Sequence, residues 1–336
     1  MKEKMPLADN VELLVAEPPV PAASTAEPQQ STVRYRVVLK FAYWHLGALC
    51  GLYLAPSAHR ATLVLNVVTF LAAGLGTTAG AHRLWSHRAY RAARPLQVLL
   101  VLMQTLACQH CVINWVRDHR LHHKYVDTDA DPYSARRGLF FSHIGWLLLR
   151  KHPEVLRRGD MIDMADLQRN PVLQFQKKYY YPLNILLAFI LPVLIPVVFW
   201  GEWWSHAHHV QLLSLMVGSH VTFCVNSLAH ARGNRPYDAT ITPVQNTALY
   251  LLTYGEGHHN YHHAFPSDYR LSEFGMNHLN YTTALIELLA RIGWAYDLKQ
   301  ASPEMVAKRA HRTGDGSRPC PMTAKDGLGE GRLKLK

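Results

Sequence analysis

The sequence has few cysteines, and this shortage excludes a secreted scaffold held by disulfides. Five cysteines occur in 336 residues, four of them in apolar segments, which is not the even, loop-borne pattern of a disulfide framework. A reducing compartment is expected. Cys108 and Cys111 form a CxxC pair, but the pair lies in an apolar run that no strand pattern precedes. Inert buried thiols are therefore favoured over a redox pair.

Acidic residues are also scarce. The chain has 24 of them against 35 lysines and arginines, which gives a net charge of +11. A basic excess indicates an acidic partner such as nucleic acid, anionic lipid or phosphate. The first residues, 1–32, lack the charged-then-apolar layout of a cleaved signal and are rich in Pro, Ala, Glu, Gln, Ser and Thr. We expect a disordered tail there.

Long apolar runs separate polar stretches, although the mean hydropathy of −0.07 hides them. Residues 61–80 contain no charged side chain, and about 20 residues at 1.5 Å each span the roughly 30 Å hydrocarbon layer. Three further runs are comparable, and the four occupy residues 37–55, 61–80, 182–200 and 210–228. They predict an all-α integral membrane protein with two helical hairpins. Trp203 and Trp204 between the last two runs suit a membrane interface.

The apolar run at 95–113 has a different predicted place. The histidine clusters before and after this run must meet at one site, so both ends of the run lie on the same side of the membrane. The run would then have to cross the membrane either twice or not at all, and about 19 residues are too few to cross twice. We expect a helix in the interface. Basic loops around it orient that side, and both termini, to the cytosol. A last helix is expected at about 282–295, within a membrane domain at 33–300. A basic and disordered C-terminal tail is expected at 301–336.

Three histidine clusters stand out, namely HRLWSH at 82–87, HRLHH at 119–123 and HNYHH at 259–263. In a helix, positions i, i+3 and i+4 share a face, so each HxxHH is expected to present three imidazoles to one point. Asn226 and His230 add two polar side chains at i, i+4 near the cytosolic end of the last span. A single histidine would be read as surface. This number in these spacings predicts a metal site instead.

The donor set limits the choice of metal. Eight or nine imidazoles without thiolate exceed the shell of a structural zinc, and no HExxH motif of a zinc protease is present. Nitrogen ligands with labile positions suit iron, and a pair of redox metals with O2 can attack an unactivated C–H bond. A hydrocarbon substrate delivered at the membrane is implied. Seven histidines without such spacing are left to surface, packing or interface roles: His45, His143, His152, His206, His208, His209 and His220.

Six strings carry a resemblance over about residues 34–315: GAHRLWSHRAY, WVRDHRLHHKYVDTDADPY, RRGLFFSHIGWLL, NSLAH, RPYDATITPVQN and GEGHHNYHHAFPSDYR. The chain resembles the membrane acyl-CoA desaturases of the stearoyl-CoA desaturase type. The resemblance implies four membrane helices under a cytosolic cap that binds two iron ions. It assigns the iron ligands to His82, His87, His119, His122, His123, His230, His259, His262 and His263, with Asn226 binding through water.

The resemblance also implies a reaction and its partners. The family inserts a cis double bond, most often at carbon 9 (Δ9), into a fatty acyl-CoA at the endoplasmic reticulum membrane. It uses O2 and two electrons that come from NADH through a reductase and cytochrome b5. No HPGG haem motif is present, so the donor should be a separate protein. No nucleic-acid partner is expected, and the acidic partners are membrane lipid and the phosphates of CoA.

Family positions that contact substrate are partly altered. Matching positions imply CoA contacts at Arg117, Asp118, Arg150 and Lys151, whose cations could neutralise phosphate, and a tunnel end at Asn66 and Phe70. Departures from the family pattern occur at Val37, His110, Phe223 and His258. Chain length, headgroup handling and double-bond position therefore stay open.

Two other functions are compatible with part of this pattern. A fatty hydroxylase or alkane oxygenase of the same histidine-rich style usually has HxxxH in its first cluster, whereas this chain has HxxxxH. A non-enzymatic zinc-binding receptor or transporter is the third possibility. Transporter sites usually lie near mid-span, whereas these clusters lie in loops and at helix ends.

Overall fold

Four helical segments are long and apolar enough to cross a membrane. In the computed structural model, residues 32–273 and 280–318 are described, and all of them fall within one unit, Ser31–Lys336. The predicted disorder at 1–31 and at 319–336 lies outside the described residues. The four spans are Tyr35–Ser57, Arg60–Ser86, Tyr180–Trp200 and Trp204–His230. The prediction of two hairpins is confirmed, because only a few residues separate the members of each pair.

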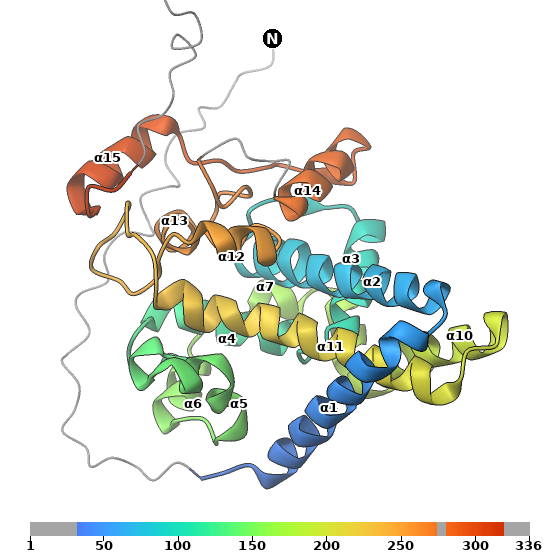
Figure 1. Cartoon of the computed structure of the whole chain (residues 1–336). Helices are drawn as coiled ribbons and strands as arrows, with labels where there is room; N and C mark the ends of the chain where they lie inside the picture. The colour runs from blue at the N-terminus through green and yellow to red at the C-terminus, as the bar shows by residue number, and fades with distance from the viewer. Residues whose placement is uncertain (1–31, 274–279, 319–336) are drawn as a thin grey trace, which may run out of the picture. The chain divides into compact units, whose positions relative to one another are not determined.

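Each span combines a main α-helix, labelled α1, α2, α10 or α11 in Figure 1, with one or two shorter helical pieces. The first hairpin contains α1 (Tyr35–Leu54), η2 (Ala55–Ser57), α2 (Arg60–Leu75) and the π-helix η3 (Gly76–Ser86). The second contains α9 (Tyr180–Asn184), η6 (Ile185–Ile190), α10 (Leu191–Trp200), α11 (Trp204–Ser227) and η7 (Leu228–His230). The π-helical turns extend the second span beyond the apolar run. They carry polar residues such as His82 into the interior of the protein.

Small residues let the spans approach closely. A Cβ atom added to Gly51 of α1 would lie 2.1 Å from the carbonyl oxygen of His209 on α11, so only glycine fits there. Gly76 plays the same part between η3 and α3 (Arg94–Leu106), where an added Cβ would lie 2.3 Å from the backbone nitrogen of Gln104. Close backbone approach over small residues is the usual packing mode of membrane helices. It fixes α1 against α11 and the second span against α3.

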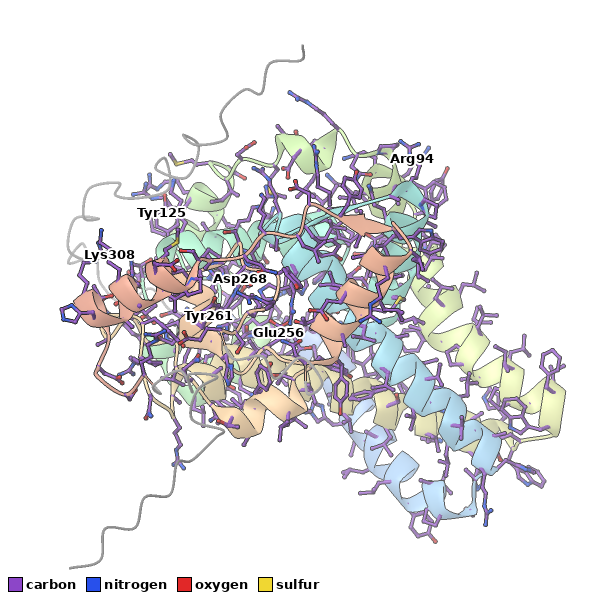
Figure 2. The ribbon with its side chains drawn as sticks, turned by 90° about the horizontal axis from the view of Figure 1, so that it is seen from above. Arg94, Tyr125, Glu256, Tyr261, Asp268 and Lys308 are labelled. Atoms are coloured by element: carbon purple, nitrogen blue, oxygen red, sulfur yellow. The ribbon has the colours of Figure 1, made fainter. Side chains whose placement is uncertain are left out.

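The outward faces of the spans are apolar. Exposed side chains include Leu39, Leu46, Leu49, Val64, Val68, Leu194, Val198 and Phe199. Lipid is the solvent that such faces require. Figure 2 shows the pale blue and yellow-green spans extending to one side, away from the labelled Tyr261, Asp268 and Lys308.

The remaining elements form a mostly helical cap. Its main helices are α3, α4 (Val112–Tyr125), η4 (Ala135–Arg137), η5 (Phe141–Gly145), α5 (Trp146–Leu148), α6 (Pro153–Gly159), α7 (Ala165–Gln168), α8 (Pro171–Lys178), α12 (Thr247–Leu252), α13 (His259–Ala264), α14 (Tyr281–Arg291) and α15 (Pro303–Thr313). Two short strands, β1 (Arg91–Ala92) and β2 (Ala295–Tyr296), pair antiparallel. The largest core cluster joins η3, α3, α4, α8 and α14. This cluster holds the end of the second span against α4.

Three predicted boundaries need correction. The single helix expected at 95–113 ends at Leu106, and α4 begins at Val112, because Cys108 and His110 adopt positive φ values of 56° and 67° between them. The helix expected at 282–295 is α14, which ends at Arg291 and is followed by β2. Disorder after residue 301 is wrong for α15, which Ser302 caps by accepting a hydrogen bond from the Met305 amide. Buried Val306 anchors α15 to the cap.

Candidate metal centre

The structure gathers nine histidines into two groups, defined here as the first and second clusters. Within each cluster, one ring nitrogen per residue lies within 4.8 Å of the others. The first cluster contains His82, His87, His119, His123 and His262. The second cluster contains His122, His230, His259 and His263. These are the nine histidines that the sequence analysis selected. The clusters are adjacent, since the rings of His123 and His263 stack with centroids 4.1 Å apart.

Each HxxHH motif serves both clusters, which corrects the expectation that its three imidazoles meet at one point. In α4, His119 and His123 belong to the first cluster and His122 to the second. In α13, His259 and His263 belong to the second and His262 to the first. At about 100° per residue, positions i and i+4 lie 40° apart and position i+3 lies on the other side of i. One short helix therefore supplies two neighbouring centres.

Ring nitrogens within the clusters face one another at short range. The Nε2 atom of His262 lies 3.0 Å from that of His82 and 2.9 Å from that of His123. The Nε2 atom of His259 lies 3.1 Å from that of His230 and 3.2 Å from that of His263. A neutral imidazole nitrogen cannot satisfy two facing lone pairs with one hydrogen. A cation between the rings satisfies all of them.

Burial favours the neutral, ligand-competent form of five of the clustered rings. Burial, followed by repulsion from neighbouring histidines, lowers the pKa of several rings well below the usual range, namely His87, His119, His123 and His262. The same causes lower the pKa of His259 to about 3. Metal ligation by histidine requires the neutral ring. An all-imidazole donor set with two adjacent centres suits a pair of transition-metal ions.

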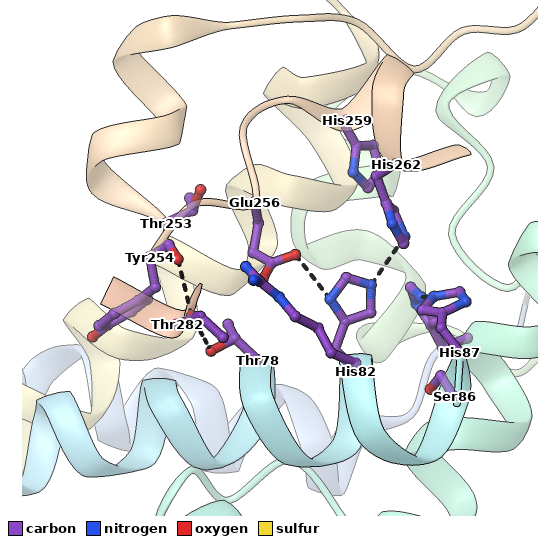
Figure 3. A network of polar contacts seen from close by, with 12 residues as sticks. Thr78, His82, Ser86, His87, Thr253, Tyr254, Glu256, His259, His262 and Thr282 are labelled. Carbon is purple, nitrogen blue, oxygen red and sulfur yellow. Dashed lines mark hydrogen bonds and ion pairs between the residues drawn. The ribbon is translucent and has the colours of Figure 1, made fainter. Parts of the chain in front are cut away.

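Glu256 orients the first cluster and was missed by the sequence analysis (Figure 3). Its Oε2 atom lies 2.8 Å from His82 Nδ1, and its Oε1 atom accepts a hydrogen bond of 2.9 Å from Arg83. Arg83 is fully buried and also donates to the carbonyl oxygen of Tyr269 at 2.8 Å. Burial opposes the carboxylate charge, but His82 and Arg83 outweigh it and lower the pKa of Glu256 to about 2. The carboxylate therefore turns His82 Nε2 toward the cluster.

The second cluster has its own supporting groups. His122 Nδ1 lies 2.9 Å from Asp131 Oδ1, and Asp131 also accepts the backbone amide of Tyr133 at 3.1 Å. His230 Nδ1 lies 2.8 Å from the Thr242 hydroxyl, which donates to Asp127 at 2.8 Å. A carboxylate behind a ligating histidine fixes the tautomer and the ring direction. Aspartates that follow an HxxHH motif within a few residues are the sequence signal that could have identified Asp127 and Asp131.

A cavity of about 380 Å³ runs beside the clusters. Histidines of both clusters line it, represented by His82, His119, His122 and His259. Asn226 lines it too. A polar row crosses the cavity wall, where Trp115 Nε1 donates to Gln109 Oε1 at 3.1 Å and Gln109 Nε2 donates to Thr222 at 2.9 Å. A molecule bound in the cavity would therefore lie beside the histidine clusters.

Basic residues lie along the cavity beside the cap. Arg117 and Lys151 both pair with Asp118, the arginine at 3.2 Å, and all three line the cavity. Arg150 is exposed and lies outside the lining, so the structure does not bring this predicted residue to the cavity. Arg34 and Lys40 of the first span line it as well, and the sequence analysis missed both. Cations outnumber the one carboxylate among these residues.

The predicted tunnel-end residues have different positions. Phe70 lines the cavity and packs on Tyr254, with ring centroids 5.9 Å apart. Asn66 is buried beside it but does not line the cavity, and its amide donates to the Thr62 carbonyl at 2.9 Å. Among the positions that depart from the family pattern, three line the cavity, namely Val37, His110 and Phe223. The fourth, His258, stacks on Tyr250 behind the clusters.

Comparisons with known proteins agree with this site. Residues 60–296 match the fatty acid desaturase family. The chain is 54% identical to the acyl-CoA Delta(11) desaturase of Spodoptera littoralis over 295 residues, 86% of this chain and 87% of that relative. It is 49% identical to the acyl-CoA Delta-9 desaturase of Acheta domesticus over 298 residues, 88% and 83% of the two chains. It is 46% identical to human stearoyl-CoA desaturase 5 over 298 residues, 88% and 90%.

The chain belongs to the fatty acid desaturase family, within the acyl-CoA desaturases. It is an O2-dependent oxidoreductase and a multi-pass membrane protein. This membership confirms the resemblance noted in the sequence. Membership of the acyl-CoA desaturases argues against both alternatives, the zinc-binding receptor or transporter and the hydroxylase.

Proposed function

We propose that the protein inserts a cis double bond into the chain of a fatty acyl-CoA, using two iron ions held by the two histidine clusters. The observation that carries the proposal is the convergence of nine imidazoles into adjacent clusters along one cavity. The first cluster would hold one ion through five nitrogens. The second cluster would hold the other through four nitrogens and, by way of a water, Asn226.

The iron pair would supply, with O2, the oxidising power to remove two hydrogens from neighbouring methylenes. The protein itself orients the metal ligands, positions the acyl chain and excludes water from it. Glu256 and Asp131 keep the rings of His82 and His122 oriented toward their clusters. Apolar walls that include Trp44 keep the chain in place and keep water away from it.

The substrate proposal follows from the two kinds of cavity lining. Arg34, Lys40, Arg117 and Lys151 offer cations to the phosphates of CoA. The aromatic and aliphatic part, between the first, second and fourth spans, takes the acyl chain. Apolar pockets with a few placed polar groups are typical ligand sites. Binding of the remote CoA group would then determine which carbons lie beside the clusters.

The double-bond position is proposed as carbon 9 or carbon 11. The resemblance in the sequence favoured Δ9. Two relatives at 54% and 52% identity are named as Delta(11) desaturases, however, and a Delta-9 desaturase has 49% identity. A shift by two carbons requires only a different seating of the same chain in the cavity.

Partners and location complete the proposal. Electrons would come from cytochrome b5 and its NADH-dependent reductase, and the basic cap would steer the acidic haem protein toward it. The enzyme would lie in the endoplasmic reticulum membrane with its termini and the metal centre in the cytosol, an orientation that the basic loops of that side favour.

The test is a product analysis. The full chain is expressed in yeast that lacks its own acyl-CoA desaturase, and the fatty acids are analysed by gas chromatography and mass spectrometry after derivatisation of the double bond. We expect monounsaturated acids with a cis bond at carbon 9 or 11. Absence of new unsaturated acids from cells that contain the membrane-inserted protein, or the presence of hydroxy acids instead, would refute the proposal.

A further inference from the structure

The inner end of the cavity is unexpectedly polar. Along α11 the lining residue farthest from the metal centre is Gln211, about 22 Å along the helix axis from Asn226 at 1.5 Å per residue. Ser214, about one turn nearer to the metal centre, also lines the cavity, as does Thr69 of α2. A cavity for a hydrocarbon chain does not need three polar side chains where the chain should end.

Gln211 has an unused acceptor in this position. The side chain is 4% exposed, and its Nε2 atom donates to the carbonyl oxygen of Ala188 at 2.8 Å. Its Oε1 atom is buried and has no hydrogen-bond partner among the described residues. A buried acceptor is costly when it is unpaired, and buried polar atoms in native proteins usually have a partner. The amide nitrogen of Gln211 is hydrogen-bonded to η6, whereas its oxygen could accept a hydrogen bond from a bound molecule.

The neighbouring hydroxyls also offer acceptors. Ser214 Oγ donates to the Asn66 carbonyl at 3.1 Å, and Thr69 Oγ1 donates to the same carbonyl at 3.0 Å. Both hydroxyl hydrogens are therefore already donated, so each hydroxyl can only accept a hydrogen bond from a bound molecule. A guest group at this end would meet acceptors, so it should carry a hydrogen-bond donor.

We propose that the inner end of the cavity is a subsite for a hydroxyl donor. Its ligand is the terminal hydroxyl of an ω-hydroxyacyl chain or, behind a plain chain, a water molecule. The inference rests on the proposed function, since it takes the cavity to be the acyl tunnel. A site with buried acceptors discriminates strongly between a hydroxyl and a methyl group. An apolar tunnel end would instead reject the hydroxyl, because burial would leave it unpaired.

The experiment compares substrates of equal size. An ω-hydroxyacyl-CoA of n carbons and a plain acyl-CoA of n+1 carbons have the same number of heavy atoms, with n chosen as the plain chain length that the enzyme desaturates fastest. We expect the wild-type ratio of kcat/KM, hydroxyl over methyl, to be at least one. Gln211→Leu should lower this ratio at least tenfold, and Ser214→Ala should lower it several-fold. Leu215→Met, which changes an apolar lining residue, should leave it unchanged.

The plain chain of n carbons separates the two sources of the hydroxyl. If the substrate supplies it, the ω-hydroxyacyl-CoA reacts faster than the plain chain of n carbons. If a water supplies it, the plain chain of n carbons reacts faster than the ω-hydroxyacyl-CoA. Either result supports the subsite, provided that Gln211→Leu lowers the kcat/KM ratio of the two substrates of equal size. A wild-type ratio far below one, unchanged in Gln211→Leu and Ser214→Ala, overturns the inference. Gln211→Met replaces Gln211→Leu if that variant fails to accumulate in membranes. Failure of wild type to desaturate any of the three substrates overturns the proposed function instead.

Discussion

Two groups of histidines in this molecule have ring nitrogens about equally close together, yet their arrangements differ. One is the pair of clusters beside the cavity. The other joins His45 of α1, His220 of α11 and His143 of η5. His220 Nε2 lies 3.0 Å from His45 Nε2, and His220 Nδ1 lies 2.9 Å from His143 Nε2. We call this second group the histidine chain.

The histidine chain is linear, whereas the clusters converge. His220 uses its two nitrogens for two different neighbours, so the three rings have no common point. The chain ends on the Phe41 carbonyl, 2.6 Å from His45 Nδ1, and on the Ser227 hydroxyl, 2.9 Å from His143 Nδ1. In the clusters, several Nε2 atoms face one another and carboxylates hold Nδ1 atoms from behind. Convergence and an outer carboxylate, rather than closeness alone, distinguish a metal centre.

Loss of one converging ring should have the largest effect. We expect His262→Ala to abolish desaturation, by more than about 100-fold, and to lower the bound metal, since His262 Nε2 faces two other rings of the first cluster. Metal analysis and product analysis of the purified variant check this. His311→Ala, on exposed α15, is the matched control and should behave as wild type. Full activity of the His262 variant would remove the cluster from the chemistry.

Loss of an outer carboxylate should have the next largest effect. Glu256→Gln keeps the shape but removes the charge behind His82, and we expect the metal affinity to fall about 10–100-fold. Titration with a competing chelator measures that affinity. Glu154→Gln, at an exposed pair with Arg157, is the control. An affinity that stays at the wild-type value would show that the carboxylate does not support the metal.

Asn226 is predicted to act through a water rather than directly. Asn226→Ala should therefore lower turnover while losing less metal than His230→Ala, because an indirect ligand contributes less binding energy than a direct one. Both quantities are measured on the same preparations. Greater metal loss in Asn226→Ala than in His230→Ala would make Asn226 the stronger ligand and contradict the water-mediated role.

The histidine chain should respond in the opposite way. His220→Leu leaves facing nitrogens of His45 and His143 without their partner inside the protein. We expect a loss of about 1–3 kcal/mol in the free energy of unfolding and no loss of metal. Thermal unfolding in detergent and metal analysis test the two halves of this prediction. Metal loss without a change in stability would show that the chain belongs to the metal centre.

The smallest expected effect concerns substrate length. Phe70→Ala enlarges the cavity, so the preference should shift toward longer acyl chains, with a gain of about 0.8 kcal/mol for each added methylene that is buried. The ratio of rates on two acyl-CoA lengths is the measurement. Phe199→Ala, on a lipid-facing side chain, is the control. An unchanged ratio in an active Phe70→Ala enzyme would show that this residue does not limit the chain.

The sequence predicted the metal centre better than its surroundings. Helical spacing indicated the six histidines of the two HxxHH motifs, because i, i+3 and i+4 positions are local features that one short segment displays. The resemblance, rather than this spacing, completed the set of nine with His82, His87 and His230. The histidine chain had no such signal, since His45, His143 and His220 come from three distant segments. Glu256 was missed for the same reason: its partner His82 lies far away in the sequence.

Helix boundaries were predictable where apolar runs are long. The four spans follow from their length and lack of charge, but the run at 95–113 did not show the break around Cys108 and His110, where two positive φ values depend on tertiary packing. The helix α15 was missed because Val306 is the one buried residue in an otherwise polar stretch. Local pattern predicts elements, and tertiary contacts decide where they stop.

The most direct test of the account is the metal content of the purified wild-type protein. Elemental analysis of the detergent-extracted full chain should give about two iron ions per chain and little zinc, since two converging clusters and no third site are available for ligation among the described residues. A single iron per chain, or zinc in place of iron, would contradict the two-iron centre on which the proposed desaturation depends.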